Sequence, residues 1–166
     1  SLPLAYSRFA FLWLDPQHPF IQRSMPTSDG ASLCRSPATG ALHALVTDHV
    51  VQGRVIFPGA GYLEMARAAG ATALHGVYFL QPLAVEVPGL FTECEMADGR
   101  FEVRSGEAAA LSDATVHCSG ALAARDGWQR VDHASVRCQS LVAADTRALY
   151  DSFDLVGLQY GPSYRT

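Results

Sequence analysis

One helical segment with almost no polar residues, predicted over residues 59–72, constrains the fold more than any other feature of the sequence. Two adjacent faces of this helix are filled by small and apolar residues: Leu63, Ala66 and Gly70 on one, and Tyr62, Met65 and Ala69 on the other. Its only charged side chains are Glu64 and Arg67. A helix this poor in polar residues should be buried on most sides, so the rest of the chain is expected to wrap around it.

Strand patterns dominate on both sides of this helix. Alternating or β-branched runs predict strands at residues 20–25, 31–34, 40–47, 76–80, 83–87, 90–96, 99–105 and 114–123. The turn at residues 97–99 should join two of them in a hairpin, and residues 145–153 are predicted to be helical. One buried helix wrapped by an antiparallel sheet is an α+β layer arrangement.

Composition narrows the class of protein. The 166 residues are 49% hydrophobic and 17% charged, which favours a folded core. The net charge of −4, without any basic run, argues against nucleic-acid and membrane-surface partners. No apolar run is long enough for a membrane span and no signal peptide is evident, so a cytoplasmic protein is expected. The four widely spaced cysteines, Cys34, Cys94, Cys118 and Cys138, are expected to be free thiols and not metal ligands.

The segment that precedes the helix holds groups that suit carbonyl chemistry. His49 opens an apolar run, Gly53 permits a backbone turn, and Pro58 stands where a helix start tolerates proline. A neutral imidazole can accept a proton, and the Gly59 amide at the helix N-terminus can stabilise charge on a carbonyl oxygen. The pattern alone also fits a purely structural histidine, and Gly-x-Gly before a helix is a weak phosphate-binding signal.

The same residues resemble the dehydratase domain of modular type I polyketide synthases. His49, Gly53 and Pro58 match its H-x-x-x-G-x-x-x-x-P motif, and residues 59–66 are typical of the helix start in that family. Three further landmarks fall in family order: His18-Pro19-Phe20 is similar to an opening His-Pro-Leu, His117-Cys118-Ser119-Gly120 to His-Ala-x-Gly, and residues 157–164 to G-x-x-Y-G-P-x-F with Tyr164 in place of Phe. His18 and His117 are expected to make structural hydrogen bonds.

The resemblance implies a double hotdog, two α+β units that each wrap an antiparallel sheet around a central helix. The implied substrate is a β-hydroxyacyl thioester on the phosphopantetheine arm of an acyl carrier protein, which loses water to become α,β-unsaturated. His49 would be the general base and the Gly59 amide would hold the thioester carbonyl. Tyr160 and Pro162, together with Gly53 and Pro58, would form the substrate side of the site. No metal and no cofactor of its own is implied.

Domain boundaries are also implied by the resemblance. Residues 1–14 would be a connector from a preceding acyltransferase domain, 15–125 the N-terminal hotdog, 126–144 a linker, and 145–166 the truncated start of a second hotdog. The family's second catalytic residue is an Asp in a D-x-x-x-Q/H motif beyond Y-G-P, so Asp145, Asp151 and Asp154 cannot take that role. The fragment alone is therefore expected to be inactive.

Two alternatives remain open. The chain could be a degenerate hotdog module that only holds the acyl chain or organises its neighbours, or part of a product-template domain that guides cyclisation. Besides the carrier protein, the expected partners are neighbouring synthase domains and, if the parent is a homodimer, its second copy.

Overall fold

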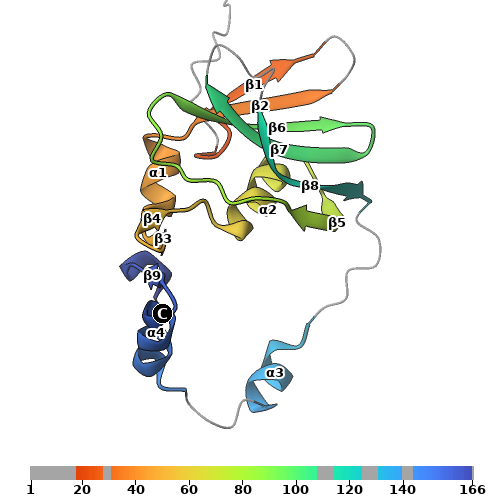
Figure 1. The fold of residues 1–166 in the computed structure, drawn as a ribbon. Helices are drawn as coiled ribbons and strands as arrows, with labels where there is room; N and C mark the ends of the chain where they lie inside the picture. Colours follow the sequence, from red (N-terminus) through yellow and green to blue (C-terminus); the bar gives the residue numbers. More distant parts are fainter. Residues whose placement is uncertain (1–17, 28–30, 108–113, 125–130, 140–143, 166) are drawn as a thin grey trace, which may run out of the picture.

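A computed structural model describes residues 18–27, 31–107, 114–124, 131–139 and 144–165 (Figure 1). The predicted connector at residues 1–14 lies outside this part of the chain. The strands in chain order are β1 (Arg23–Pro26), β2 (Ser32–Pro37), β3 (His49–Val51), β4 (Arg54–Val55), β5 (Ala73–Phe79), β6 (Leu90–Ala97), β7 (Arg100–Glu107), β8 (Thr115–Ala123) and β9 (Leu158–Tyr160). The helices are α1 (Ala41–Val46), α2 (Gly59–Ala68), α3 (His133–Gln139) and α4 (Thr146–Leu155), and a 3₁₀ turn, η2, spans Pro162–Tyr164.

Six strands form the main sheet in the order β1-β2-β6-β7-β8-β5, and every neighbouring pair is antiparallel. The predicted hairpin joins β6 to β7, with Ala97 opposite Arg100 and positive φ angles of 50° at Asp98 and 71° at Gly99. Left-handed backbone at both central residues is what a tight two-residue hairpin turn requires. This part of the fold was predictable from the local sequence.

Helix α2 packs against one face of this sheet (Figure 1). Its buried residues are Gly61, Tyr62, Met65 and Ala66, and they meet core residues from the strands such as Cys94, Phe101, Val103 and Cys118. The opposite side of the helix is open, because Ala60, Leu63 and Arg67 are exposed. The predicted central helix is therefore correct, but it is covered on one side and not on most sides.

A second, smaller sheet contains His49 and the residues that directly follow it. It has three antiparallel strands in the order β4-β3-β9, so a strand near residue 50 pairs with one near residue 160. His49 lies opposite Tyr160 and Val51 opposite Leu158. This pairing brings two sequence motifs together that are more than a hundred residues apart.

The strand predicted at residues 40–47 is wrong, because this segment forms α1. Leu42, Ala44 and Val46 alternate as in a strand, but Leu42 and Val46 also stand one helical turn apart, and both are fully buried. Gly40 has a φ of 64° and turns the chain into the helix. Six residues are too few for periodicity to separate the two structures.

Two further predicted boundaries, at residues 83–87 and at the end of α2, need correction. Residues 83–87 form only an isolated bridge, Ile56 to Ala84, because prolines stand at both ends of the segment. Helix α2 ends at Ala68, ahead of Gly70 with its φ of 119°. The predicted linker at residues 126–144 contains α3, whose described residues are all exposed.

Candidate active site

His49 is the first residue of β3, and its ring is bonded to the main chain of Ile56, the residue after β4. Its Nδ1 lies 2.7 Å from the main-chain oxygen of Ile56, and the Ile56 N–H donates to the His49 oxygen at 3.1 Å. A carbonyl can only accept a hydrogen bond, so Nδ1 carries the proton and donates. In the neutral ring the lone pair is then on Nε2, which is the form that a general base needs.

Gly53 sets the hairpin that brings Ile56 back to His49. Gln52 and Gly53 have φ angles of 51° and 75°, so the turn between β3 and β4 is left-handed at both central positions. The Gly53 N–H donates to the Gln159 side chain at 2.9 Å. The spacing between His49 and Gly53 is therefore explained by the backbone geometry of this hairpin. Gly53 itself lies in an exposed turn.

Pro58 and Gly59 form the start of α2. Pro58 is the N-cap residue with φ −70° and ψ 148°, and no side chain caps the helix. The first N–H groups of a helix have no intrahelical partner and stand at the positive end of its dipole. The Gly59 amide is therefore available to a carbonyl oxygen. Gly61 packs against the Phe57 ring, so closely that a Cβ there would lie 2.7 Å from it.

His49 and Gly59 line the same cavity, which has a volume of about 350 Å³. The remaining lining residues are mostly apolar: Ile56, Phe57, Tyr62, Phe79, Leu80, Gln81 and Pro82. Among these residue types, histidine is the one whose side chain ordinarily titrates near neutral pH. Pro58, Gly53, Tyr160 and Pro162 are not part of this lining.

Tyr62 lies at the buried side of the cavity, with 3% of its surface exposed. Its ring contacts those of Phe57 and Phe79, at centroid distances of 4.9 and 6.1 Å. Its hydroxyl lies near the Leu83 backbone but forms no well-aligned hydrogen bond within the described residues. Burial raises the pKa of Tyr62 above its usual value, so the hydroxyl stays neutral.

Two tyrosines pack against the His49 ring from the C-terminal motif. The Tyr160 ring is stacked on it at 5.3 Å and 29°, and the Tyr164 ring is tilted against it at 5.5 Å and 51°. The Tyr164 hydroxyl donates to the Leu45 oxygen at 3.3 Å. Pro162 is exposed at the first position of η2, where it shapes the turn between the two tyrosines. Tyr160 thus contacts the candidate base itself.

His117 is buried, at 4% exposure, and contacts the cavity wall at Gln81. Its Nδ1 lies 3.1 Å from the Gln81 oxygen and its Nε2 lies 2.8 Å from the Ser105 hydroxyl. Its own main-chain oxygen accepts from the Leu80 N–H at 2.8 Å. Burial lowers the pKa of His117, so the ring is neutral and structural, as the sequence predicted.

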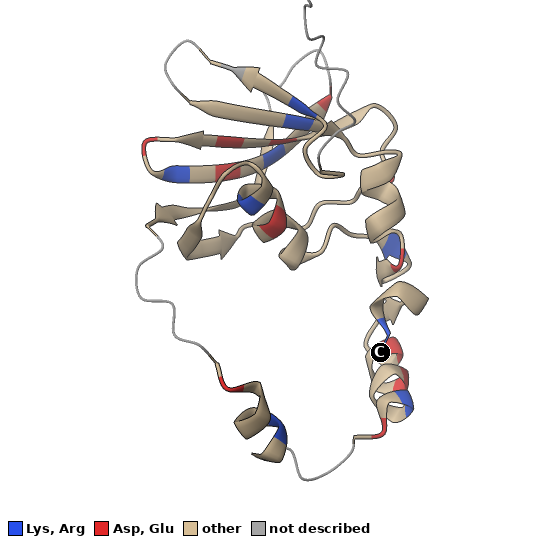
Figure 2. Cartoon of the chain, turned by 180° about the vertical axis from the view of Figure 1, so that it is seen from behind, with Lys and Arg blue, Asp and Glu red and all other residues tan. Residues whose placement is uncertain are grey.

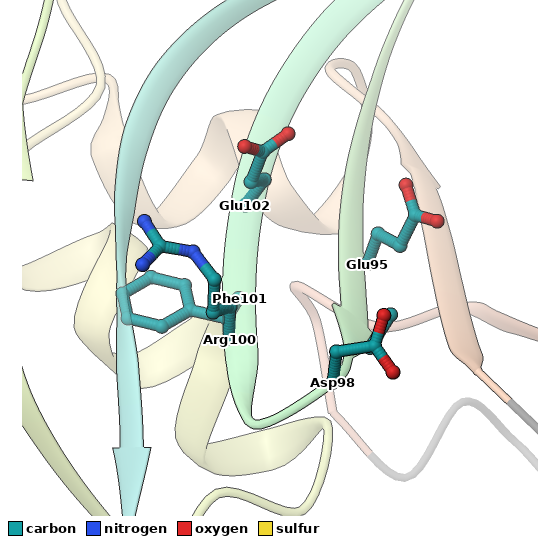
Figure 3. A pocket seen from close by; sticks show the side chains of 6 residues that line it. Glu95, Asp98, Arg100, Phe101 and Glu102 are labelled. Carbon is teal, nitrogen blue, oxygen red and sulfur yellow. The ribbon is translucent and has the colours of Figure 1, made fainter.

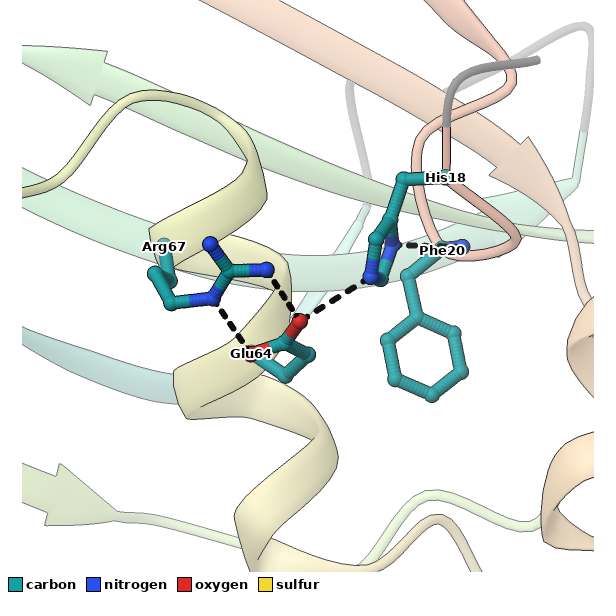
Figure 4. Close-up of polar contacts among 4 residues, drawn as sticks. All are labelled: His18, Phe20, Glu64 and Arg67. Carbon is teal, nitrogen blue, oxygen red and sulfur yellow. Dashed lines mark hydrogen bonds and ion pairs between the residues drawn. The ribbon is translucent and has the colours of Figure 1, made fainter.

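His18 is also structural and joins the His-Pro-Phe motif to α2 (Figure 4). The Phe20 N–H donates to Nδ1 at 3.2 Å, which leaves the proton on Nε2 to donate to Glu64 at 3.0 Å. Arg67 donates to the same carboxylate at 2.7 Å. Arg67 and His18 lower the pKa of Glu64 to about 2, although its side chain is 37% exposed and solvent screens the interaction.

Charged residues of both signs occur on the strands of the main sheet (Figure 2). Glu93, 1% exposed, is bonded by Arg35 at 2.6 Å and by Arg104 at 3.2 Å. A smaller cavity of about 220 Å³ lies at the β6–β7 turn, and its lining includes Glu95, Asp98, Arg100 and Glu102 (Figure 3). Within the described residues no three side chains are grouped as metal ligands, and no helix there is long and apolar enough to cross a membrane.

Comparison with known proteins decides the family. The sequence profile of the polyketide synthase dehydratase domain matches residues 18–117, from the His-Pro-Phe motif to His117. The chain belongs to this dehydratase family. The polyketide synthase ThaG of Burkholderia thailandensis is 35% identical over 144 residues, which cover 73% of this chain and 2% of ThaG.

Solved dehydratase structures share the fold. The erythromycin dehydratase superposes with a TM-score of 0.73 at 22% identity, over 87% of this chain and 59% of that one. The CurK dehydratase gives a TM-score of 0.69 at 20% identity, over 87% and 56%. The α+β hotdog fold predicted from the sequence is thus confirmed, and this dehydratase chain spans somewhat over half the length of its structural relatives. Two CurK variants, one His to Phe and one Asp to Asn, are inactive.

Part of the cavity around His49 was not predicted from the sequence. Phe79 at the end of β5 and the loop residues Leu80, Gln81 and Pro82 lie on its wall, but the sequence pattern predicted only strands at residues 76–80 and 83–87 there. Tyr62 was assigned only to a helix face, and the contact of Tyr164 with His49 was not foreseen. A signal existed for Tyr62 alone, because it stands three positions beyond Gly59 on the helix that borders the cavity.

Proposed function

We propose that this chain supplies the base and the carbonyl-binding amide of a polyketide synthase dehydratase site. The substrate is a β-hydroxyacyl thioester on the phosphopantetheine arm of an acyl carrier protein, and the product is the α,β-unsaturated thioester. The observation that carries the proposal is the hydrogen bond from His49 Nδ1 to Ile56, which leaves the Nε2 lone pair available in a ring that lines the cavity with Gly59.

In the proposed reaction Nε2 of His49 takes the α-proton. The electron pair of that C–H bond forms the double bond while the β C–O bond breaks, and the hydroxyl leaves as water after it gains a proton. The Gly59 amide stabilises the negative charge that develops on the thioester oxygen, where a preorganised donor is worth about 3–4 kcal/mol. The mostly apolar cavity walls suit an acyl chain and strengthen these electrostatic interactions.

The proton for the departing hydroxyl needs a second group. We assign it to an Asp that lies outside this chain, as in the family motif, so these residues alone should not turn over substrate. Loss of activity in CurK variants with one His or one Asp replaced supports a site built from these two residue types. The carrier protein, the neighbouring synthase domains and any pairing of two parent copies belong to the same proposal, as do the boundaries at residues 15–125 and 145–166.

The test uses the complete natural protein with a β-hydroxyacyl thioester on its carrier protein. Mass spectrometry of the acyl chain should show loss of water, and His49→Gln should lower the rate by at least about 100-fold, as expected for loss of a general base. A His75→Gln variant is the control, since His75 is exposed on β5 and does not line the cavity. Unchanged turnover in His49→Gln would refute the assignment, and a carrier-bound substrate that is held without elimination would favour the degenerate module.

A further inference from the structure

Asp48, the residue before His49, closes a clasp between two segments that are far apart in the sequence. Its carboxylate accepts a hydrogen bond from the Ser163 N–H at 2.8 Å. Its main-chain oxygen accepts another from the Gly161 N–H, also at 2.8 Å. Asp48 therefore holds the turn after β9 by two hydrogen bonds, to Gly161 and to Ser163, and these two bonds are the clasp.

Close packing at Gly161 shows how tightly the two segments fit. A Cβ at this position would overlap the Asp48 carboxylate and lie 2.7 Å from its Cβ. The Gly161 φ of −76° is open to any residue, so backbone conformation does not require glycine there. The requirement comes from the Asp48 side chain.

In the sequence, the two residues that Asp48 holds lie between the two tyrosines whose rings contact His49. Tyr160 directly precedes Gly161, and Tyr164 directly follows Ser163. The two tyrosine rings are stacked on each other at 5.9 Å, and both contact the imidazole. A shift of the residues between them would therefore move both rings away from His49.

The Asp48 carboxylate that makes this contact with Ser163 is ionised at neutral pH. The backbone N–H of Ser163, and then its side chain, lower the pKa of Asp48 below its usual value. An ionised carboxylate forms a shorter and stronger hydrogen bond to an N–H than a neutral acceptor does. Asp48 thus acts as an anionic anchor for the turn.

We propose that Asp48 is a positioning residue for His49: it fixes the Gly161–Ser163 turn so that the Tyr160 and Tyr164 rings hold the imidazole in its reactive orientation. This inference rests on the proposed role of His49 as the base. Asp48 does not line the cavity, so it acts through the rings and not on the substrate. A base displaced by about 1 Å can lose up to about 100-fold in rate, which is the scale of effect expected.

The kinetic test compares three variants of the complete natural protein. Asp48→Ala should lower kcat by about 10- to 100-fold and leave KM nearly unchanged, because substrate contacts are retained. Asp48→Asn should restore most of kcat, since its amide oxygen can still accept from Ser163. Asp132→Ala is the matched control, because Asp132 also accepts backbone N–H groups, at the exposed start of α3.

A second measurement does not depend on turnover. NMR of ¹³C-labelled histidine rings, with the His49 signal assigned from its loss in His49→Ala, should show a ring-current shift from the two tyrosines. Asp48→Ala should move this signal, and Asp132→Ala should not. If the wild type fails to dehydrate its substrate, the proposed function fails while the NMR result still decides the role of Asp48. An active wild type, with kcat and His49 signal both unchanged in Asp48→Ala, would overturn the inference, as would an Asp48→Asn variant as impaired as Asp48→Ala.

Discussion

Removal of one hydroxyl, in Ser105→Ala, should destabilise the fold through His117. Nδ1 of His117 donates to the Gln81 oxygen, so Nε2 must accept the Ser105 O–H, and the imidazole is only 4% exposed. The alanine variant leaves this buried acceptor without a donor, which costs about 1–3 kcal/mol. The side chain of Ser105 is itself buried, at 6% exposure, so water has little access to replace it.

Urea unfolding of the purified chain, followed by circular dichroism, measures the effect. With a slope of about 2 kcal/mol per molar urea, a loss of about 2 kcal/mol lowers the midpoint by about 1 M. Ser24→Ala is the matched control, because Ser24 is exposed on the edge strand β1 and should change stability by less than about 0.5 kcal/mol. Equal midpoints for the Ser105 and Ser24 variants would show that His117 does not depend on this hydroxyl.

Two further predictions concern the same part of the core. Gly120→Ala places a Cβ 2.6 Å from the Phe101 ring and 3.3 Å from the Val77 backbone, so overpacking should destabilise the chain by about 1–3 kcal/mol; an unchanged urea midpoint would contradict this. Burial lowers the pKa of His117, so its contribution to stability is complete above about pH 6.5 and is lost as the pH falls from there toward its folded pKa. Urea midpoints measured across this interval should fall in the wild type and fall less in His117→Gln, and parallel curves would contradict the assignment.

Local patterns predicted the parts of the fold that depend on local structure. The period of α2 and the Asp98-Gly99 turn of the β6–β7 hairpin are both set by neighbouring residues. Segment α1 was mistaken for a strand because Leu42 and Val46 satisfy both periods over a short run. Strand β9 was not predicted, since its three residues become a strand only by pairing with β3.

The sequence predicted both His49 and Gly59 as residues of the site, and both line one cavity. The spacing between His49 and Gly59 is set by the β3–β4 hairpin and then by the start of α2. Both are local structures, so the spacing could be predicted from the sequence. The end of β5 and the loop that follows it, residues 79–82, line the same cavity through contacts with distant parts of the chain, such as His117 to Gln81, and no local pattern specifies these. The role of His49 as the base is a proposal that the kinetic experiments test, and the roles of Gly59 and Tyr160 belong to the same proposal.

The pairing of β3 with β9 has a consequence for the order in which the molecule assembles and opens. Asp48 and Ser163 are 115 residues apart, so joining them closes a long loop with an entropic penalty on the order of 4 kcal/mol. A three-residue strand, the clasp and a few further contacts, such as those of Tyr160 and Tyr164 with His49, offset this, whereas the six-stranded sheet is held by long ladders. During synthesis the surroundings of His49 should therefore form after the main sheet, and in the folded protein amide hydrogens of β9 should exchange by local opening well before those of β6 and β7.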